Sequence, residues 1–334
     1  MIRRTTTISL VLAATSASAE VPRVMTDIAP VHSLVARVME GVGEPEVLLP
    51  PGASPHDYSF RPSDARRLSD ADLVVWMGEG LEPWLADPIE TLGSGATLEL
   101  LETDGWPKRE LSDAHDHGVD GDDHDHDHDE HDHADEAHDD HDHEGEDHED
   151  HDTHAGHGHD HGDFDPHAWL DPFNAGVWLT HIAEALSEAD PENAQTYAEN
   201  AEAAQDDLAS LISEITAQLG DPGDATFAVG HDAYGYFFDR FELTMSGAVT
   251  LSDAQAPGPA RIAALKEQFA EDGTRCILVD PQSGAEWPAL TIEGTDIAVK
   301  EVDPLGGGIE TGPDFYPALL RDMAGKLADC LTEE

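Results

Sequence analysis

The sequence predicts an α/β fold of two lobes, each a parallel sheet flanked by helices, joined by a long, rigid spine helix. Three observations lead to this prediction. Strand-like and helix-like segments alternate before residue 112, the same alternation returns after residue 221, and an uninterrupted helical pattern of almost 30 residues lies between them. Alternation of this kind is typical of parallel sheets with helices on both faces.

The first lobe begins with short apolar runs separated by amphipathic helices. Residues 72–77 (DLVVWM) form a continuous apolar run, which is typical of a strand buried on both faces. Val31, Leu34, Val35 and Val38 share one helical face. In order, the predicted elements are strand 24–28, helix 31–39, strand 46–49, helix 62–68, strand 72–77, helix 81–92 and strand 97–101.

Two Asp-Pro pairs predict helix starts in the middle of the chain. Asp171 precedes Pro172, and Asp190 precedes Pro191, each as a cap followed by a first-turn proline. The first helix is expected to end near residue 187. The second keeps helical apolar spacing to residue 219 and stops at Gly220.

The second lobe repeats the alternation and contains both cysteines of the chain. Cys276 opens a strand and Cys330 ends the last helix. In an exported protein such a pair predicts a disulfide, with a metal or redox site as the alternative. In order, the predicted elements are strand 226–229, helix 233–241, strand 243–250, helix 259–270, strand 275–279, helix 284–292, strand 296–302 and helix 313–331.

The first 19 residues read as a cleavable signal peptide. Arg3 and Arg4 precede a short apolar run, and Ala17-Ser18-Ala19 ends it. No window approaches the roughly 20 apolar residues of a membrane-spanning helix, so we expect an exported protein without an integral membrane segment. The predicted boundaries are 1–19 for the signal peptide, 20–112 and 164–189 for the N-terminal lobe, 113–163 for a separate loop, 190–220 for the spine helix and 221–334 for the C-terminal lobe.

The loop 113–163 is rich in histidine and acidic residues and lacks lysine and arginine. It carries 16 of the 21 histidines and 23 acidic residues. Imidazoles at this density indicate weak binding of several zinc-like ions, and the lack of apolar residues predicts disorder. The predicted low-affinity ligands are His115, His117, His124, His126, His128, His131, His133, His138, His141, His143, His148, His151, His154, His157, His159 and His161.

The acidity extends beyond this loop. The formal net charge is −56, and −33 remains when the 23 loop acids are set aside. This balance argues against nucleic acid and anionic membrane surfaces as direct partners.

Three of the five other histidines are the candidates for a selective metal site, with ordinary surface histidines as the alternative. His56 follows the strand ending at residue 49, His231 follows the strand 226–229, and His167 precedes a helix cap. Ligands of parallel α/β sheets bind beyond the carboxyl ends of strands, and three imidazoles can hold Zn²⁺ with one position open. His181 is expected to be a packed helical residue, and His32 an outer contributor at most.

Several motifs in order resemble the periplasmic zinc-binding proteins of bacterial ABC importers, of the ZnuA type. The stretches are PGASPHDYSFRPSDARRLSDADLVVWMGEGLEPWL, HAWLDP, VGHDAYGYFF, RCILVDPQ and VDPLG. The resemblance implies a cluster A-I solute-binding fold, a monomer in the periplasm, an inner-membrane zinc ABC permease as partner, and one Zn²⁺ in the interlobe cleft. It places His56, His167 and His231 at the three ligand positions and pairs Cys276 with Cys330.

The first histidine motif departs from the family pattern. Many members have a glutamate before this histidine, whereas this chain has Pro55. The fourth ligand is therefore expected to be water or a carboxylate of the C-terminal lobe, for which Asp303 is the candidate.

The leading prediction is capture of Zn²⁺ and its delivery to a permease, without catalysis, with loop 113–163 as a collector or sensor. The alternatives are a manganese- or iron-type solute-binding protein, a metal buffer in which the loop is the working part, and a secreted zinc hydrolase. No H-E-x-x-H motif supports the hydrolase.

Overall fold

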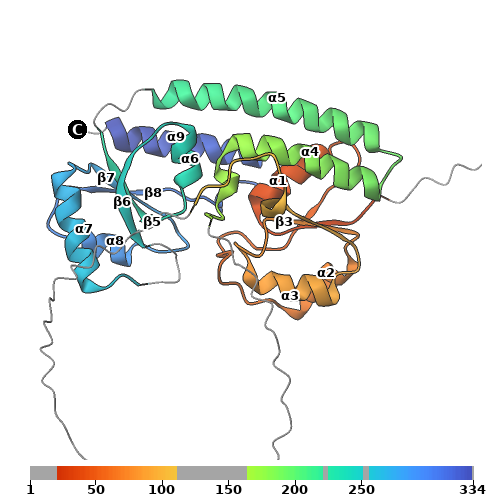
Figure 1. The fold of residues 1–334 in the computed structure, drawn as a ribbon, viewed down its shortest axis with the longest axis horizontal. Helices are drawn as coiled ribbons and strands as arrows, with labels where there is room; N and C mark the ends of the chain where they lie inside the picture. The colour runs from red at the N-terminus through yellow and green to blue at the C-terminus, as the bar shows by residue number, and fades with distance from the viewer. Residues whose placement is uncertain (1–20, 111–163, 221–224, 251–255, 333–334) are drawn as a thin grey trace, which may run out of the picture. The chain divides into compact units, whose positions relative to one another are not determined.

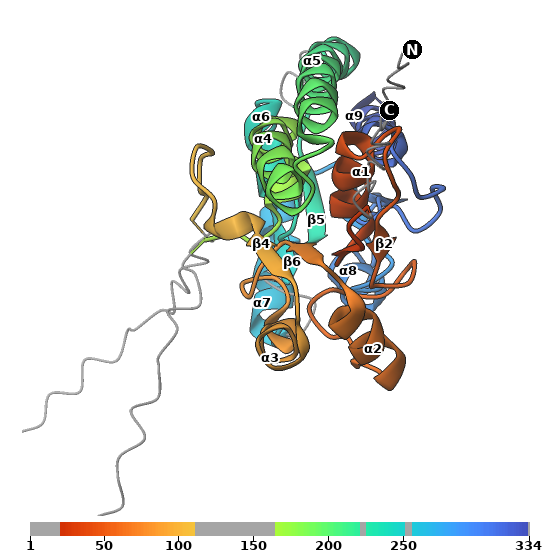
Figure 2. The ribbon, with the colours of Figure 1, turned by 90° about the vertical axis from the view of Figure 1, so that its right-hand side faces the viewer.

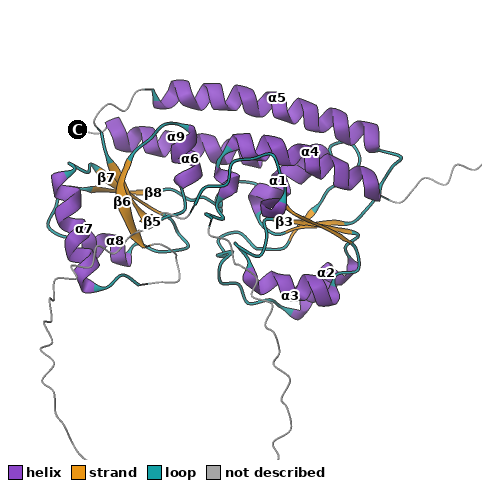
Figure 3. Cartoon of the chain, in the orientation of Figure 1, coloured by secondary structure: helices purple, strands orange, loops and turns teal. Residues whose placement is uncertain are grey.

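Two parallel four-stranded sheets organise the chain (Figures 1 and 3). The computed structural model describes residues 21–110, 164–220, 225–250 and 256–332, so the predicted signal peptide and the histidine-rich loop lie outside the described residues. The first sheet has the order β2-β1-β3-β4 and the second β6-β5-β7-β8. The strands are β1 (Val24–Thr26), β2 (Glu46–Val47), β3 (Leu73–Trp76), β4 (Ala96–Glu99), β5 (Phe227–His231), β6 (Met245–Thr250), β7 (Cys276–Val279) and β8 (Ala298–Glu301).

The N-terminal lobe surrounds the first sheet with α1 (Ala29–Val38), α2 (Pro62–Asp70), α3 (Pro83–Leu92) and α4 (Pro172–Ala189). Each of these helices has a proline in its first turn, where no intrahelical donor is lost. The predicted cap of α4 is confirmed, because the Asp171 carboxylate accepts the Phe173 N–H at 2.8 Å. After β4 the chain turns through a short 3-10 helix, Leu100–Glu102, where the sequence had predicted further strand.

The long helix α5 (Ala194–Leu219) packs against α4 and α1 of the N-terminal lobe and against α9 (Phe315–Thr332) (Figures 1 and 2). Its buried positions include Tyr197, Leu208 and Ile215, which keep helical spacing. At 26 residues it is about 39 Å long. This helix therefore contacts elements of both lobes.

The start of α5 differs from the prediction. The helix begins at Ala194 with Asn193 as its cap, three residues after the Asp190-Pro191 pair. The Asp190 carboxylate accepts hydrogen bonds from Asn193 Nδ2 at 2.7 Å and from the Tyr197 hydroxyl at 2.9 Å. Residues 191–193 form a turn before the helix, so Asp190 lies outside the cap position that the sequence pattern predicted.

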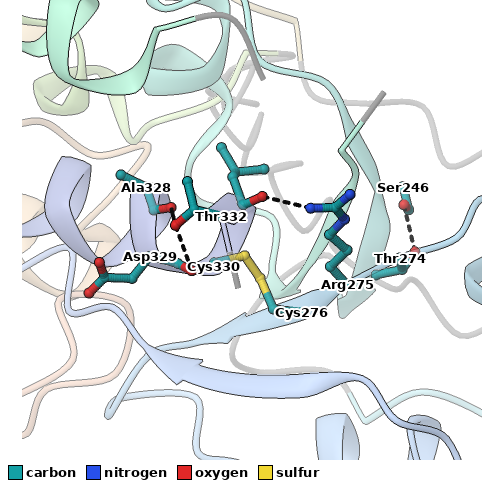
Figure 4. Close-up of a disulfide and its surroundings, with 9 residues drawn as sticks. Ser246, Thr274, Arg275, Cys276, Ala328, Asp329, Cys330 and Thr332 are labelled. Atoms are coloured by element: carbon teal, nitrogen blue, oxygen red, sulfur yellow. Dashed lines mark hydrogen bonds between the residues drawn. A yellow bond between two sulfur atoms is a disulfide. The ribbon is translucent and has the colours of Figure 1, made fainter. Parts of the chain in front are cut away.

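The C-terminal lobe surrounds the second sheet with α6 (Gly235–Arg240), α7 (Pro259–Glu271), α8 (Glu286–Thr291) and α9. The predicted disulfide between Cys276 and Cys330 joins β7 to the end of α9 (Figure 4). Beside it, Arg275 Nη1 donates to the Leu331 carbonyl at 2.9 Å. A cross-link over 54 residues stabilises the folded chain by ~4 kcal/mol on the chain-entropy account.

None of the helices in the described residues is long and apolar enough to cross a membrane.

Candidate metal site

The structure brings His56, His167 and His231 together. His56 lies in the loop between β2 and α2, His167 directly before the short 3-10 helix Ala168–Leu170, and His231 at the end of β5. Their ligand nitrogens lie within 4.8 Å of one another, and within the described chain no other group of three metal-ligating side chains is this close. His56 follows β2 and His231 is the last residue of β5, so both lie at the carboxyl ends of strands, as predicted from the fold class.

The spacing of the imidazoles suits a single small ion. The Nε2 atoms of His56 and His167 are 3.1 Å apart. Two ligands on a tetrahedral Zn²⁺ at 2.0–2.1 Å are separated by about 3.3 Å. The cavity that the three rings line has a volume of about 20 Å³, which is room for one ion or one water molecule.

A buried imidazole nitrogen faces this cavity without a partner. His231 is 5% exposed, and its Nε2 atom has no hydrogen-bond partner among the described residues. An unsatisfied buried polar atom costs roughly 1–3 kcal/mol. A coordinated cation would remove that cost, so the donor set fits a metal ion.

Asp165 sets the orientation of the His167 ring. Its Oδ1 accepts from His167 Nδ1 at 2.7 Å and from the His167 backbone N–H at 3.0 Å. The bond at Nδ1 assigns the proton to that nitrogen and leaves the Nε2 lone pair directed at the cavity. Asp165 is fully buried and forms an ion pair with Arg109 at 3.2 Å.

Asp280 places a negative charge beside His231. Its Oδ2 lies 3.8 Å from His231 Nδ1, and its Oδ1 accepts the Ser283 N–H at 2.7 Å. Burial alone would raise the pKa of Asp280, but the interactions with His231 and Ser283 outweigh burial and lower that pKa below its ordinary value. The carboxylate is therefore ionised, and its charge offsets part of the +2 of a cation bound by three neutral imidazoles.

The structure does not bring Asp303 to the three histidines. Its Oδ1 accepts from Leu305 N at 2.9 Å and Gln282 Nε2 at 3.1 Å, and its Oδ2 accepts from Gly307 N at 2.7 Å. These bonds fold the glycine-rich loop after β8, and the group that could hold an ion does not include Asp303. This carboxylate is better placed to shape the loop than to ligate.

Asp280 is the carboxylate that the sequence reasoning missed. It follows β7 directly, so the rule that pointed to His231, a side chain just beyond the carboxyl end of a strand, could have found it. Pro55 lines the cavity, and its carbonyl accepts from Trp84 Nε1 at 2.6 Å.

The remaining predicted positions lie away from the three-histidine cavity. His32 Nε2 is 3.2 Å from the Pro45 carbonyl, and His181 Nε2 is 3.1 Å from the Asp104 carbonyl. The sixteen histidines of loop 113–163 lie outside the described residues.

Comparison with known proteins decides the family. The profile of the ZnuA family, described as zinc-uptake complex component A, periplasmic, matches residues 24–330. The chain belongs to this family. The predicted resemblance is thereby confirmed, and with it the class of protein: a periplasmic zinc-binding component of a high-affinity uptake system.

Individual members of the ZnuA family cover nearly the whole chain. The chain is 43% identical over 321 residues to the high-affinity zinc uptake system protein ZnuA of Paracoccus denitrificans, covering 96% of this chain and 94% of the relative. It is 40% identical over 316 residues to the protein of the same name from Brucella suis, covering 93% and 92%.

The fold is also that of solved relatives. A crystal structure of ZnuA superposes with a TM-score of 0.71 at 18% identity and covers 94% of this chain and 100% of that structure. The predicted fold of two parallel α/β sheets is confirmed.

Proposed function

We propose that this ZnuA family member captures one Zn²⁺ with His56, His167 and His231 and delivers it to an inner-membrane ABC permease. The observation that carries the proposal is the convergence of three imidazoles on a cavity of about 20 Å³. Neutral imidazole donors suit zinc, whereas sites rich in carboxylates suit manganese. Relatives that are named for high-affinity zinc uptake support the same choice of cargo.

The small cavity favours carriage over catalysis. A zinc hydrolase needs space beside the metal for a substrate and a general base. This cavity admits one ion or water molecule, and Trp169, Pro304 and Leu305 also line it. We infer that any fourth ligand is a water molecule held near Asp280.

The histidine-rich loop 113–163 is proposed as a weak collector of zinc that supplies the tight site. Glu110 and Phe164, which flank the loop, pair in an antiparallel bridge, and Phe164 lies three residues before His167. A tethered set of weak ligands raises the local concentration of the ion near the cavity. A sensor of zinc sufficiency is the second candidate role, and uptake assays at scarce zinc distinguish the two.

A zinc competition titration tests the tight site. We expect the intact chain and a variant lacking 113–163 each to hold one tightly bound Zn²⁺, because the bridge between Glu110 and Phe164 lets the two cut ends meet. His167→Ala should lose that site, whereas His181→Ala, a matched change on α4, should keep it. Retention of the tight site in His167→Ala would contradict the ligand assignment, and loss of all binding on deletion of 113–163 would favour a metal buffer.

A further inference from the structure

Arg109 connects the carboxylate that orients His167 to the C-terminal lobe. Its Nη1 lies 3.2 Å from Asp165 Oδ2, and its Nε lies 3.1 Å from Asp239 Oδ2. Its backbone N–H donates to the Tyr236 hydroxyl at 2.9 Å. Asp239 and Tyr236 belong to α6, which lies beside α4 (Figures 1 and 2), so Arg109 links the carboxylate beside His167 to the helix that follows His231 in the chain.

The charge of Arg109 is matched to a buried carboxylate. Asp165 is 0% exposed, and a buried charge is costly unless it is paired. Arg109 is the cation that pairs with it among the described residues, and its planar guanidinium bonds Asp165 and Asp239 at the same time. A lysine, as a single point charge, cannot reproduce both contacts.

The backbone of α6 is shaped to receive this guanidinium. Gly235 opens α6, and a Cβ at this position would overlap with Cζ, Nη1 and Nε of Arg109. Any side chain at this position would therefore displace the guanidinium from its place beside α6. Gly235 also follows His231 by four residues, which joins α6 to a second histidine of the site.

A second ion pair, with the charges reversed, also holds α6. Arg240 of α6 bonds the Asp171 carboxylate with both Nε and Nη2, at 2.7 and 2.8 Å, and Asp171 caps α4. The N-terminal lobe thus gives a cation to Asp239 and an anion to Arg240. Through these two adjacent residues, Asp239 and Arg240, α6 is held against the segment that carries His167.

We propose that Arg109 is a positioning residue of the metal site. It acts on His167 through Asp165 and on His231 through α6, so that the two imidazoles keep a common geometry. This inference rests on the proposed function, since it concerns the same site. Without the guanidinium, the Asp165 carboxylate loses its fixed partner, the His167 ring gains freedom and the bound ion dissociates faster.

The test compares variants of the full chain by zinc affinity, zinc dissociation rate and the visible spectrum of the Co²⁺-loaded protein. Arg109→Gln should weaken zinc binding about threefold to tenfold, less than the roughly 10–100-fold cost of losing a ligand's direct partner. It should also alter the Co²⁺ spectrum. Arg109→Lys should recover part of the affinity. Gly235→Ala should act like Arg109→Gln because it displaces the guanidinium without removing a charge.

Two further variants separate positioning from general stability. Asp239→Asn removes only the ion pair between Arg109 and α6 and changes a side chain that is 68% exposed, so it tests the proposal even if Gly235→Ala fails to fold. Arg321→Gln breaks a comparable two-bond pair with Glu214 between α9 and α5, and it should leave zinc binding and the Co²⁺ spectrum unchanged.

Unchanged affinity and spectrum in both Arg109→Gln and Asp239→Asn would overturn the positioning role. An intact chain without any tight site would instead contradict the proposed function itself.

Discussion

Replacement of Asp165 by asparagine tests how the site holds its second histidine. The change keeps the size of the side chain but removes its charge and one of its two acceptor oxygens. In the unaltered chain, the Asp165 carboxylate accepts three hydrogen bonds: from His167 Nδ1 at 2.7 Å, from His167 N at 3.0 Å and from Arg109 Nη1 at 3.2 Å. An asparagine cannot satisfy all of them.

Either orientation of the new amide weakens the metal site. If its oxygen faces His167, its NH₂ group faces the Arg109 guanidinium, and a charge-assisted bond worth roughly 1.5–3 kcal/mol is lost. If its NH₂ group faces His167, Nδ1 must accept, the ring proton moves to Nε2, and the nitrogen aimed at the cavity can no longer ligate. We therefore expect zinc affinity to fall by roughly 10–100-fold, which is about 1.4–2.7 kcal/mol.

A competition assay with a chromophoric chelator at neutral pH measures this loss directly. Asp190→Asn is the matched control, because Asp190 is also buried and accepts two side-chain donors, from Asn193 and Tyr197. It should lower the free energy of unfolding and leave zinc affinity unchanged. An Asp165→Asn protein with the affinity of the unaltered chain would refute the argument that this carboxylate selects the His167 tautomer.

Three other predictions concern stability and the loop after β8. Burial raises the pKa of Glu82 well above its ordinary value and the pKa of Asp27 to about 6. These carboxyls hold their protons more tightly in the folded state, so their contribution to stability is lost as pH rises through the folded pKa values. The free energy of unfolding of Glu82→Gln, measured in urea, should therefore rise relative to that of the unaltered chain as the pH goes from 5 to 8. An equal difference between the two proteins at both pH values would contradict this. Replacing Cys276 and Cys330 by serine should lower the free energy of unfolding by ~4 kcal/mol while leaving zinc affinity intact, and a lost zinc site would show that the disulfide shapes the cavity. Asp303→Asn should weaken zinc binding by less than Asp165→Asn does, because Asp303 bonds its own loop, and complete loss of zinc binding would restore it as a ligand.

The sequence predicted the sheets and the three histidines because both follow local rules. Apolar runs such as 72–77 identify buried parallel strands, and the carboxyl ends of those strands direct attention to His56 and His231. His167 was singled out by its place before a helix cap, and the family motifs then matched all three histidines. These features depend on a few neighbouring residues or on strand direction, which sequence patterns record.

The remaining features depend on contacts between segments distant in sequence. Asp190 matches a helix cap by pattern, but its carboxylate bonds Asn193 and Tyr197 instead, and α5 starts at Ala194. Asp303 was a ligand candidate by position, but backbone amides of its own loop occupy its oxygens. The contact between Arg109 and α6 joins residues 130 positions apart, and no local pattern indicates it.

The central claim is that one zinc ion is bound by three imidazoles, and a crystal structure of the zinc-loaded protein at the zinc absorption edge tests it most directly. The account predicts one strong anomalous peak about 2.0–2.1 Å from Nε2 of His56, His167 and His231, with Asp280 outside bonding distance or joined through water. A strong peak that lacks any one of these three histidines, or one bonded to Asp303, would contradict it.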